Sequence, residues 1–374
     1  MHRPGDGSYL LIEAGPGMGK TALIAQLLHR YETETWQPGG AAVQNRPPLL
    51  YIFPRQEGGR HNPAHFLAAL NSQLLEALDF PGGVPTDADA LSRQFTTLWG
   101  EAADRTRPER PLTLLVDGLD EILPDEQGRT AADFLPTHLP PHVHVVVTSR
   151  PQPKAFDRVP AYHSLKRAQV HRLARFGPPE VRALLAQAGD SVPRDDAFIG
   201  RLVELTGGEP LFLRFLSEDV AMRGAEAAAR LEALPPLAGV EDYFREQLQA
   251  LEARAEGKTA HHVLGLLRVA HGPLSADELA EALEFPKKEV RDALQPLRRF
   301  LLGDERVELM HLEFHRLVTG AWFTRQELKG YEERLLGYCA GWREHASDYA
   351  LAHYAGHLFD AGRHDELYGL IDKA

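Results

Sequence analysis

Short apolar runs alternate with stretches of helical periodicity along the first 177 residues. The runs are apolar almost throughout, which is typical of parallel strands buried on both faces rather than of half-exposed strands. They occupy residues 9–12, 49–53, 112–116 and 143–147, with a weaker fifth run at 170–173. Helical patterns lie between them, at residues 21–31, 62–78 and 90–105. This order predicts an α/β domain with a doubly wound parallel sheet.

Strand-like runs stop after about residue 178, and helical patterns take over. Those patterns cover residues 179–188, 195–206 and 210–231. The Leu-Pro-Pro-Leu-Ala-Gly segment at 234–239 then breaks the helical pattern and is the best candidate for a linker. The region up to the linker is therefore predicted to be an all-α helical domain.

Three helices and a hairpin are predicted beyond the linker. Residues 263–270 form one apolar helix, and Ser275 opens a second helix through a capping box with Glu278. A third helix at 286–299 precedes a hairpin-like segment at 300–310. This order predicts a winged-helix domain, followed by two or three short C-terminal helices that resemble the start of a helical repeat region. The predicted parts are an α/β domain (1–177), a helical domain (178–236), a winged helix (237–325) and C-terminal helices (326–374).

Composition is that of an ordinary globular protein. The 374 residues are 43% hydrophobic and 25% charged, and no apolar run approaches the ~20 residues of a membrane span. The single cysteine, Cys339, excludes an intrachain disulfide and a cysteine-based zinc cage, and it fits a reducing cytoplasm. The net charge of −12 argues against attraction of nucleic acid by the chain as a whole, although a local basic face is compatible with it.

A phosphate-binding loop follows the first predicted strand and precedes a helix. Residues 14–21 read Ala-Gly-Pro-Gly-Met-Gly-Lys-Thr, with Ala at the first glycine position of the motif. Glycines let backbone N–H groups converge on phosphate oxygens, and the helix N-terminus adds partial positive charge. We expect Lys20 to reach the terminal phosphates of ATP or ADP and the Thr21 hydroxyl to bind Mg²⁺. The predicted cofactor-binding residues here are Gly15, Pro16, Gly17, Met18, Gly19, Lys20, Thr21 and Ala22.

Carboxylates follow the third predicted strand. Asp117 stands at the strand's carboxyl end, where P-loop enzymes hold Mg²⁺, usually through water. Asp120 or Glu121 is expected to orient or deprotonate the attacking water, the alternative being a solvated acidic turn. Arg150 ends the fourth strand in Thr-Ser-Arg-Pro, and its guanidinium suits detection of a γ-phosphate; the alternative is a surface arginine that caps a carbonyl. The predicted catalytic residues are Lys20, Asp117, Asp120, Glu121 and Arg150, and the predicted metal-binding residues are Thr21 and Asp117.

Together these motifs resemble the STAND class of P-loop signal-transduction ATPases, of the NACHT and AP-ATPase types. Two later segments are similar to family motifs: Thr-Gly-Gly-Glu-Pro-Leu at 206–211, and His-Leu-Glu-Phe at 311–314. The resemblance spans residues 8–325. It implies that Pro210 packs against the adenosine of the nucleotide and that His311 reaches the β-phosphate of ADP.

The resemblance implies a nucleotide-dependent switch with slow ATP hydrolysis. ADP would hold the domains closed, and ATP would expose a surface for self-association. Immune, defence, cell-death and transcriptional roles all fit the family. The trigger is unknown, and the effector is expected on a region preceding this sequence, so that the chain is the core of a larger protein or a short version of one. A P-loop kinase is disfavoured because no acceptor-binding lid is apparent.

Two other functions stay open. One is a DNA-binding regulator, because the third helix of the predicted winged helix carries Lys287, Lys288, Arg291, Arg298 and Arg299. The other is a nucleotide-binding scaffold without turnover. Histidine pairs spaced by four residues, 311 with 315 and 353 with 357, are interpreted as ordinary helix histidines rather than metal ligands, because no zinc-protease motif surrounds them.

Overall fold

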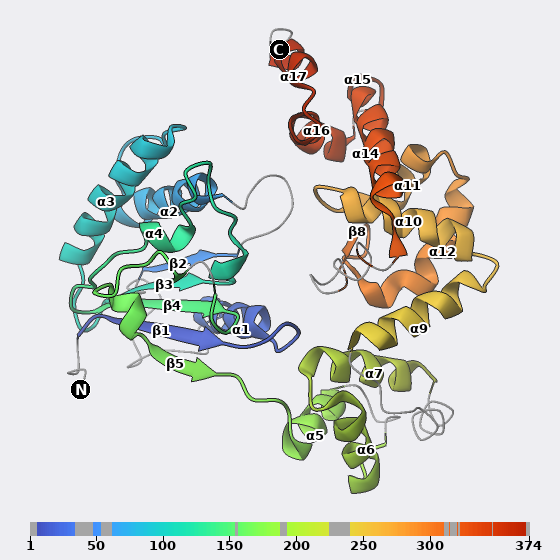
Figure 1. Cartoon of the computed structure of the whole chain (residues 1–374), viewed down its shortest axis with the longest axis horizontal. Helices are drawn as coiled ribbons and strands as arrows, with labels where there is room; N and C mark the ends of the chain where they lie inside the picture. Colours follow the sequence, from blue (N-terminus) through green and yellow to red (C-terminus); the bar gives the residue numbers. More distant parts are fainter. Residues whose placement is uncertain are drawn as a thin grey trace. The chain divides into compact units, whose positions relative to one another are not determined.

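The chain forms two compact units in the computed structural model, residues 1–174 and residues 175–374 (Figure 1). The finer division into four domains stays a prediction. The described residues are 6–33, 48–53, 62–153, 156–187, 193–223, 240–309, 314, 320, 322–345 and 347–371. The predicted linker at 234–239 lies outside them.

The first unit is built on a five-stranded sheet in the order β2-β3-β4-β1-β5, with every neighbouring pair parallel. This confirms the predicted parallel α/β sheet. All five apolar runs form strands, with bounds that differ from the prediction by at most two residues. The strands are β1 (Ser8–Glu13), β2 (Leu49–Ile52), β3 (Leu112–Val116), β4 (Val143–Ser149) and β5 (Gln169–Arg172).

Burial follows position in the sheet. Strands β3 and β4 lie inside the sheet: four of the five residues of β3 are buried, and Val143, Val145 and Val147 of β4 are fully buried. All four residues of β5 are exposed, with Val170 45% exposed, so the expectation of burial on both faces is wrong for this strand. The physical reason is its place at the sheet edge, where it pairs with β1 alone on one side.

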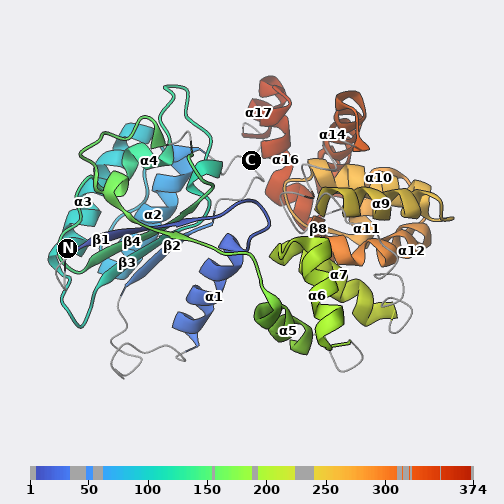
Figure 2. The same cartoon turned by 60° about the horizontal axis from the view of Figure 1, so that its bottom comes forward.

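Helices cover both faces of this sheet (Figure 2). Helix α1 (Lys20–Glu32) lies on one face, and α2 (Pro63–Leu78), α3 (Ala88–Asp104) and the short α4 (Ala131–Phe134) lie on the other. Asn62 and Asp87 accept a backbone N–H at the starts of α2 and α3, which explains where these helices begin. Leucines and aromatic residues of α2 and α3 form one core with the strands. The crossover helices therefore place the carboxyl ends of the strands at a common edge.

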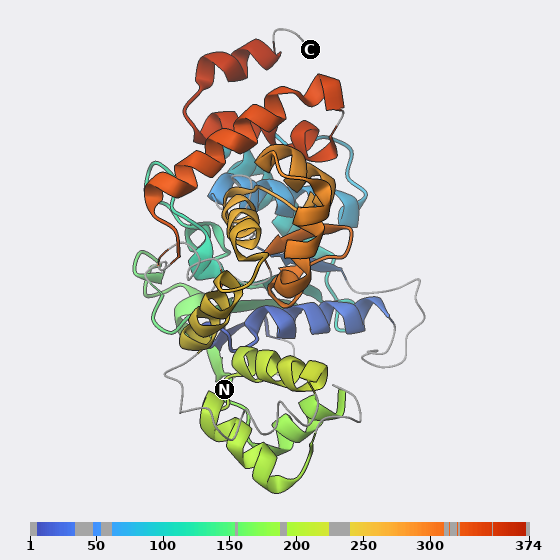
Figure 3. The same ribbon diagram turned by 90° about the vertical axis from the view of Figure 1, so that its right-hand side faces the viewer.

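The second unit is mainly helical, as Figure 3 shows. Its first helices are α5 (Pro178–Gln187), α6 (Asp196–Thr206) and α7 (Pro210–Arg223); residues 224–231 of the third predicted helix lie outside the described residues. The next are α9 (Val240–Glu252), α10 (Gly257–Val269), α11 (Ala276–Leu283) and α12 (Lys287–Leu297). Rings from separate elements pack together at its centre; Phe215 and Phe244, for example, meet edge-on at 4.6 Å between centroids.

A small antiparallel sheet accompanies the three helices predicted beyond the linker, which α9 precedes as an additional helix. Strands β7 (Leu301–Leu302) and β8 (Arg306–Leu309) form the expected hairpin, and β8 also pairs with β6 (Leu274–Ser275). The sequence analysis missed β6, because two residues are too few to show a period. The capping box of Ser275 with Glu278 is confirmed. Pro296 lies one residue before the end of α12, and a proline cannot donate the backbone hydrogen bond that continues a helix.

The C-terminal region contains more helix than predicted. Four helices follow in place of two or three short ones: α14 (Arg325–Ala340), α15 (Trp342–His345), α16 (Asp348–Asp360) and α17 (His364–Ile371). Thr324 caps the start of α14, and Ser347 caps the start of α16. Each cap satisfies backbone N–H groups at the first turn, so each helix has a defined beginning. None of the helices in the described part of the chain is both long and apolar enough to cross a membrane.

Candidate functional site

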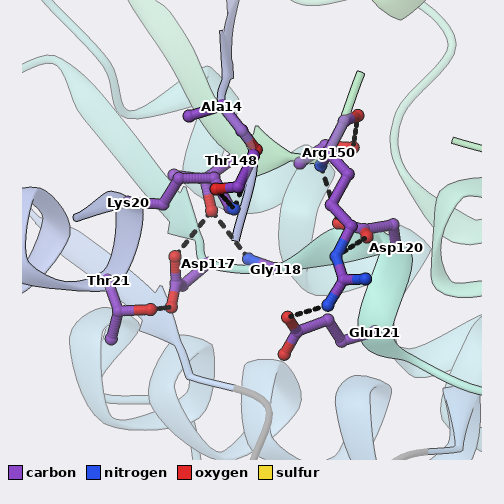
Figure 4. Close-up of polar contacts among 11 residues, drawn as sticks. Ala14, Lys20, Thr21, Asp117, Gly118, Asp120, Glu121, Thr148 and Arg150 are labelled. Carbon is purple, nitrogen blue, oxygen red and sulfur yellow. Dashed lines mark hydrogen bonds and ion pairs between the residues drawn. The ribbon is translucent and has the colours of Figure 1, made fainter. Parts of the chain in front are cut away.

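The phosphate-binding loop lies where predicted, between the end of β1 and the start of α1 (Figure 4). Gly19 precedes the helix with φ of 87°, a left-handed conformation that favours glycine. The side chain of Lys20 is turned into the loop: its Nζ donates to the carbonyl oxygens of Ala14 and Gly15 at 2.9 and 3.0 Å. These bonds hold the loop around the amino group.

Strand order brings the acidic turn to this loop. Strand β4 lies between β1, which leads into the loop, and β3, which leads into Asp117. Because all three strands are parallel, their carboxyl ends meet at one edge, where ligands of open α/β sheets bind. There Asp117, only 6% exposed, accepts hydrogen bonds from the hydroxyls of Thr21 and Thr148, both at 2.6 Å. The structure therefore unites the two predicted metal-binding residues.

Arg150 lies over the acidic turn, η2 (Leu119–Glu121). Its backbone N–H donates to Asp120 at 3.1 Å, and its guanidinium pairs with Asp120 at 3.6 Å and with Glu121 at 3.8 Å. The three side chains are 28%, 12% and 22% exposed, so water screens them only in part. Asp120 and Glu121 are therefore ion-paired with Arg150 rather than fully solvated, and the catalytic roles of the three residues stay predictions.

Electrostatics at the site depend on burial and on this charge cluster. Burial raises the pKa of Glu121, and the neighbouring Asp120 raises it further, whereas Arg150 acts in the opposite direction. Burial lowers the pKa of Lys20, against the influence of the nearby carboxylates. The upward shift moves the pKa of Glu121 toward the range useful for proton transfer at neutral pH.

The loop residues fit a phosphate and a hard cation. Helix α1 has no side-chain cap at Gly19, and a Cβ built there would meet nothing within 4 Å, so space lies open beside the helix N-terminus. Lys20 uses two of its three N–H groups in the hydrogen bonds above. A hydroxyl and a carboxylate oxygen, from Thr21 and Asp117, lie together as Mg²⁺ prefers.

Thr148 is the site residue that the sequence analysis gave no role. It is fully buried, and its hydroxyl both donates to Asp117 and accepts the N–H of Gly118 at 2.7 Å. The available signal was a hydroxyl residue at the end of the fourth strand. That signal is meaningful only once β4 is known to lie between β1 and β3.

The resemblance also suggested roles for two residues of the second unit, Pro210 and His311. Pro210 begins α7 in the second unit, after the α6 C-cap at Gly207. Its contact with adenosine stays a prediction. His311 and His315 lie outside the described residues.

One histidine of α16, His357, is part of the protein core. His357 is 4% exposed, hydrogen-bonds the Tyr349 hydroxyl at 2.7 Å and stacks on His271 at 3.7 Å between ring centroids. Burial lowers the pKa of His357 to about 3. Across the described residues, no group of three or more His, Cys, Asp or Glu side chains is arranged to hold a metal ion. His357 thus packs as a core histidine, and for His353 the interpretation as an ordinary histidine stays a prediction.

Sequence comparisons find distant relatives. A family model described as nephrocystin 3, N-terminal, matches residues 1–150. Telomerase protein component 1 of Rattus norvegicus is 25% identical over 301 residues, which cover 74% of this chain and 10% of that protein. The Mus musculus protein of the same name is 27% identical over 210 residues, which cover 50% of this chain and 8% of that protein. The chain thus spans about a tenth of the length of the curated relatives that it matches.

A solved structure resembles the whole fold. The STAND protein with a tetratricopeptide repeat sensor from Pyrococcus horikoshii matches with a TM-score of 0.59 at 15% identity, covering 98% of this chain and 47% of that one. At this identity the likeness concerns the fold alone. The parallel sheet, the loop at the end of β1 and the helical region that follows agree with it. The chain therefore has the α/β fold of a P-loop NTPase with a helical C-terminal region.

Proposed function

We propose that this chain is a nucleotide-dependent switch of the STAND class, of NACHT or AP-ATPase type, which binds ATP or ADP with Mg²⁺ and hydrolyses ATP slowly. The observation that carries the proposal is the hydrogen-bonded chain from Thr21 through Asp117 to Thr148, both bonds 2.6 Å long. It joins the phosphate loop to the acidic turn through a buried carboxylate. A glycine turn between strand and helix would not need that connection.

Each residue has a defined task in the proposed site. Backbone N–H groups at the start of α1 bind the phosphates, and Lys20 exchanges its loop carbonyls for phosphate oxygens. Thr21 and Asp117 would hold Mg²⁺, which supplies positive charge against the developing charge on the phosphates. Glu121, with its raised pKa, accepts a proton from the attacking water or orients that water.

Arg150 gives the site a means to distinguish ATP from ADP. In the structure it pairs with Asp120 and Glu121. A γ-phosphate competes for the guanidinium, because a planar fork binds oxyanions bidentately. When ATP is bound, the Arg150 guanidinium no longer pairs with Glu121, and the pKa of Glu121 then rises. We propose this partner exchange as the first step from nucleotide recognition to hydrolysis.

The signalling part of the proposal concerns the second unit. We propose that residues 178–236 act as the helical domain, 237–325 as a winged helix and 326–374 as the start of a helical region. Pro210 would contact adenosine and His311 the β-phosphate, so that ADP favours a closed state. ATP would favour an open state that self-associates in the cytoplasm. A ligand shifts such an equilibrium only through different contacts in the two states, and the γ-phosphate provides one.

No specific observation favours the DNA-binding alternative. Lys287 and Arg291 on α12 both pair with Asp277, at 2.9 and 3.1 Å, so part of the predicted basic face is neutralised within the unit. The scaffold without turnover differs from the switch in one measurable property, phosphate release from bound ATP.

In the first step of the test, a sample of the purified protein is denatured, and the nucleotide that it releases is identified by ion-exchange chromatography. Nucleotide binding by the native protein is then measured by calorimetry. Lys20→Met keeps the aliphatic stem and removes the charge among the phosphates, so we expect binding to weaken by about a hundredfold. Lys166→Met changes an exposed lysine of the same unit and serves as the control. Binding by Lys20→Met within twofold of the parent, with unchanged circular dichroism, would refute the phosphate-loop assignment.

A further inference from the structure

A single buried hydroxyl connects three elements at the edge of the sheet. Thr148 lies in β4, is 0% exposed, and donates its proton to Oδ1 of Asp117 at 2.6 Å. Its oxygen accepts the backbone N–H of Gly118 at 2.7 Å. A hydroxyl has one proton to donate and can accept through its lone pairs, so both contacts form at once. Figure 4 shows the two bonds converging on this side chain.

Both oxygens of Asp117 are held from opposite sides. Thr148 holds Oδ1, whereas Thr21 donates to Oδ2 at 2.6 Å. A carboxylate bound at one oxygen only can rotate about its terminal torsion, which is broad in energy. With Oδ1 fixed by a core residue, Oδ2 faces the phosphate loop even when the Thr21 hydroxyl turns away.

The second bond ties this carboxylate to the acidic turn. Gly118 has φ of 56° and is the first residue of the turn that carries Asp120 and Glu121. Its N–H would be buried without an acceptor if the hydroxyl were absent, which is costly. Thr148 therefore fixes the position of Asp117 and the start of the acidic turn with the same atom.

We propose that Thr148 is a positioning residue for Mg²⁺, which acts by orienting Asp117 and by anchoring the turn at Gly118. The role in Mg²⁺ binding rests on the proposed function, whereas the anchoring of Gly118 does not depend on any ligand. Residues that orient a metal ligand typically contribute ten- to a hundredfold in metal affinity.

The neighbouring residue provides a matched control. Ser149 is also 0% exposed and follows Thr148 in the same strand, but its hydroxyl donates to the Arg150 carbonyl at 2.8 Å rather than to Asp117. Ser149→Ala thus removes a buried hydroxyl at the same strand end without touching the carboxylate. Thr148→Val keeps the shape and removes the hydroxyl, and Thr148→Ser restores it.

The first measurement is ADP binding as a function of Mg²⁺ concentration, with a parallel titration in excess chelator. We expect Thr148→Val to raise the Mg²⁺ concentration for half-maximal effect by about tenfold or more, and to leave Mg²⁺-free ADP affinity unchanged within twofold. Thr148→Ser and Ser149→Ala should follow the parent protein. Equal Mg²⁺ dependence of Thr148→Val and Ser149→Ala would overturn the proposal, as would a loss that is the same with and without Mg²⁺.

The second measurement needs no ligand. Hydrogen exchange at the Gly118 amide should accelerate in Thr148→Val by at least tenfold over Ser149→Ala, because the N–H loses its acceptor. Unchanged protection would show that the hydroxyl does not anchor the turn, and the inference would fail. If the parent protein binds no nucleotide, the proposed function and the metal role both fail, and the exchange result still decides the anchoring role.

Discussion

Arg150 is the positively charged partner that pairs with both Asp120 and Glu121, so we expect Arg150→Gln to destabilise the first unit. At 3.6 and 3.8 Å and an effective dielectric constant of about 20, each attraction is about 4–5 kcal/mol before desolvation is subtracted. Removing one partner of a fully buried pair costs about 3–5 kcal/mol. Because the Arg150 side chain is 28% exposed, we expect a smaller loss, about 2 kcal/mol at pH 8.

The loss should depend on pH with a defined sign. Burial and Asp120 already raise the pKa of Glu121, and Arg150 lowers it, so the variant raises that pKa further. The folded variant then holds a proton to higher pH than the unfolded chain does. The stability of the variant is therefore retained at low pH. It is lost as the pH rises above the pKa that Glu121 has in the unfolded chain and through the higher pKa that it has in the folded variant. The deficit should be larger at pH 8 than at pH 5.

Hydrogen exchange of peptides from β3 and β4 measures this free energy within the first unit alone. Glu121→Gln in the Arg150→Gln background removes a carboxylate that has lost its partner, so about half of the deficit should return. A deficit below about 0.5 kcal/mol at pH 8 would refute the reasoning, since that is the range of surface changes. An undiminished deficit in the double variant would show that Arg150 stabilises the unit through packing.

Two further predictions concern the acidic turn and the second unit. Asp120→Asn and Glu121→Gln should spare ATP binding and slow phosphate release by about 10²-fold, as expected for a positioned acid–base group; normal release by both variants and by the double variant would leave the turn without a role in hydrolysis. Burial lowers the pKa of His357 to about 3, so its contribution to stability is complete above the unfolded value near 6.5 and is lost as the pH falls below it. His357→Gln should therefore reduce the loss of stability between pH 7.5 and 5.5 by roughly 1 kcal/mol, measured by exchange of α16 peptides, whereas exposed His364→Gln should not.

Local signals along the chain determine much of the fold. The glycine loop with Lys20 and Thr21 predicts its own strand and helix, because the small residues, the charge and the hydroxyl act within one turn of chain. Strands of four or more residues are predicted for the same reason, because a buried strand shows as a run of consecutive apolar residues. A strand of two residues, such as β6, carries no such period and was missed. The exposure of β5 was missed because the sequence does not mark which strand lies at an edge.

The assembly of the site was decided by tertiary structure. The sequence by itself placed Asp117 and Arg150 at strand ends, but it contained no measure of the order in which those strands lie. Only the insertion of β4 between β1 and β3 brings Thr148 against Asp117, and Asp117 against Thr21. Residues 31 and 96 positions apart in the chain meet through this order. Sequence patterns report interactions within one element, whereas strand order follows from how all the elements share a core. The sequence therefore named candidate residues such as Asp117 and Thr21, but it indicated neither Thr148 nor the hydrogen bonds that connect the three.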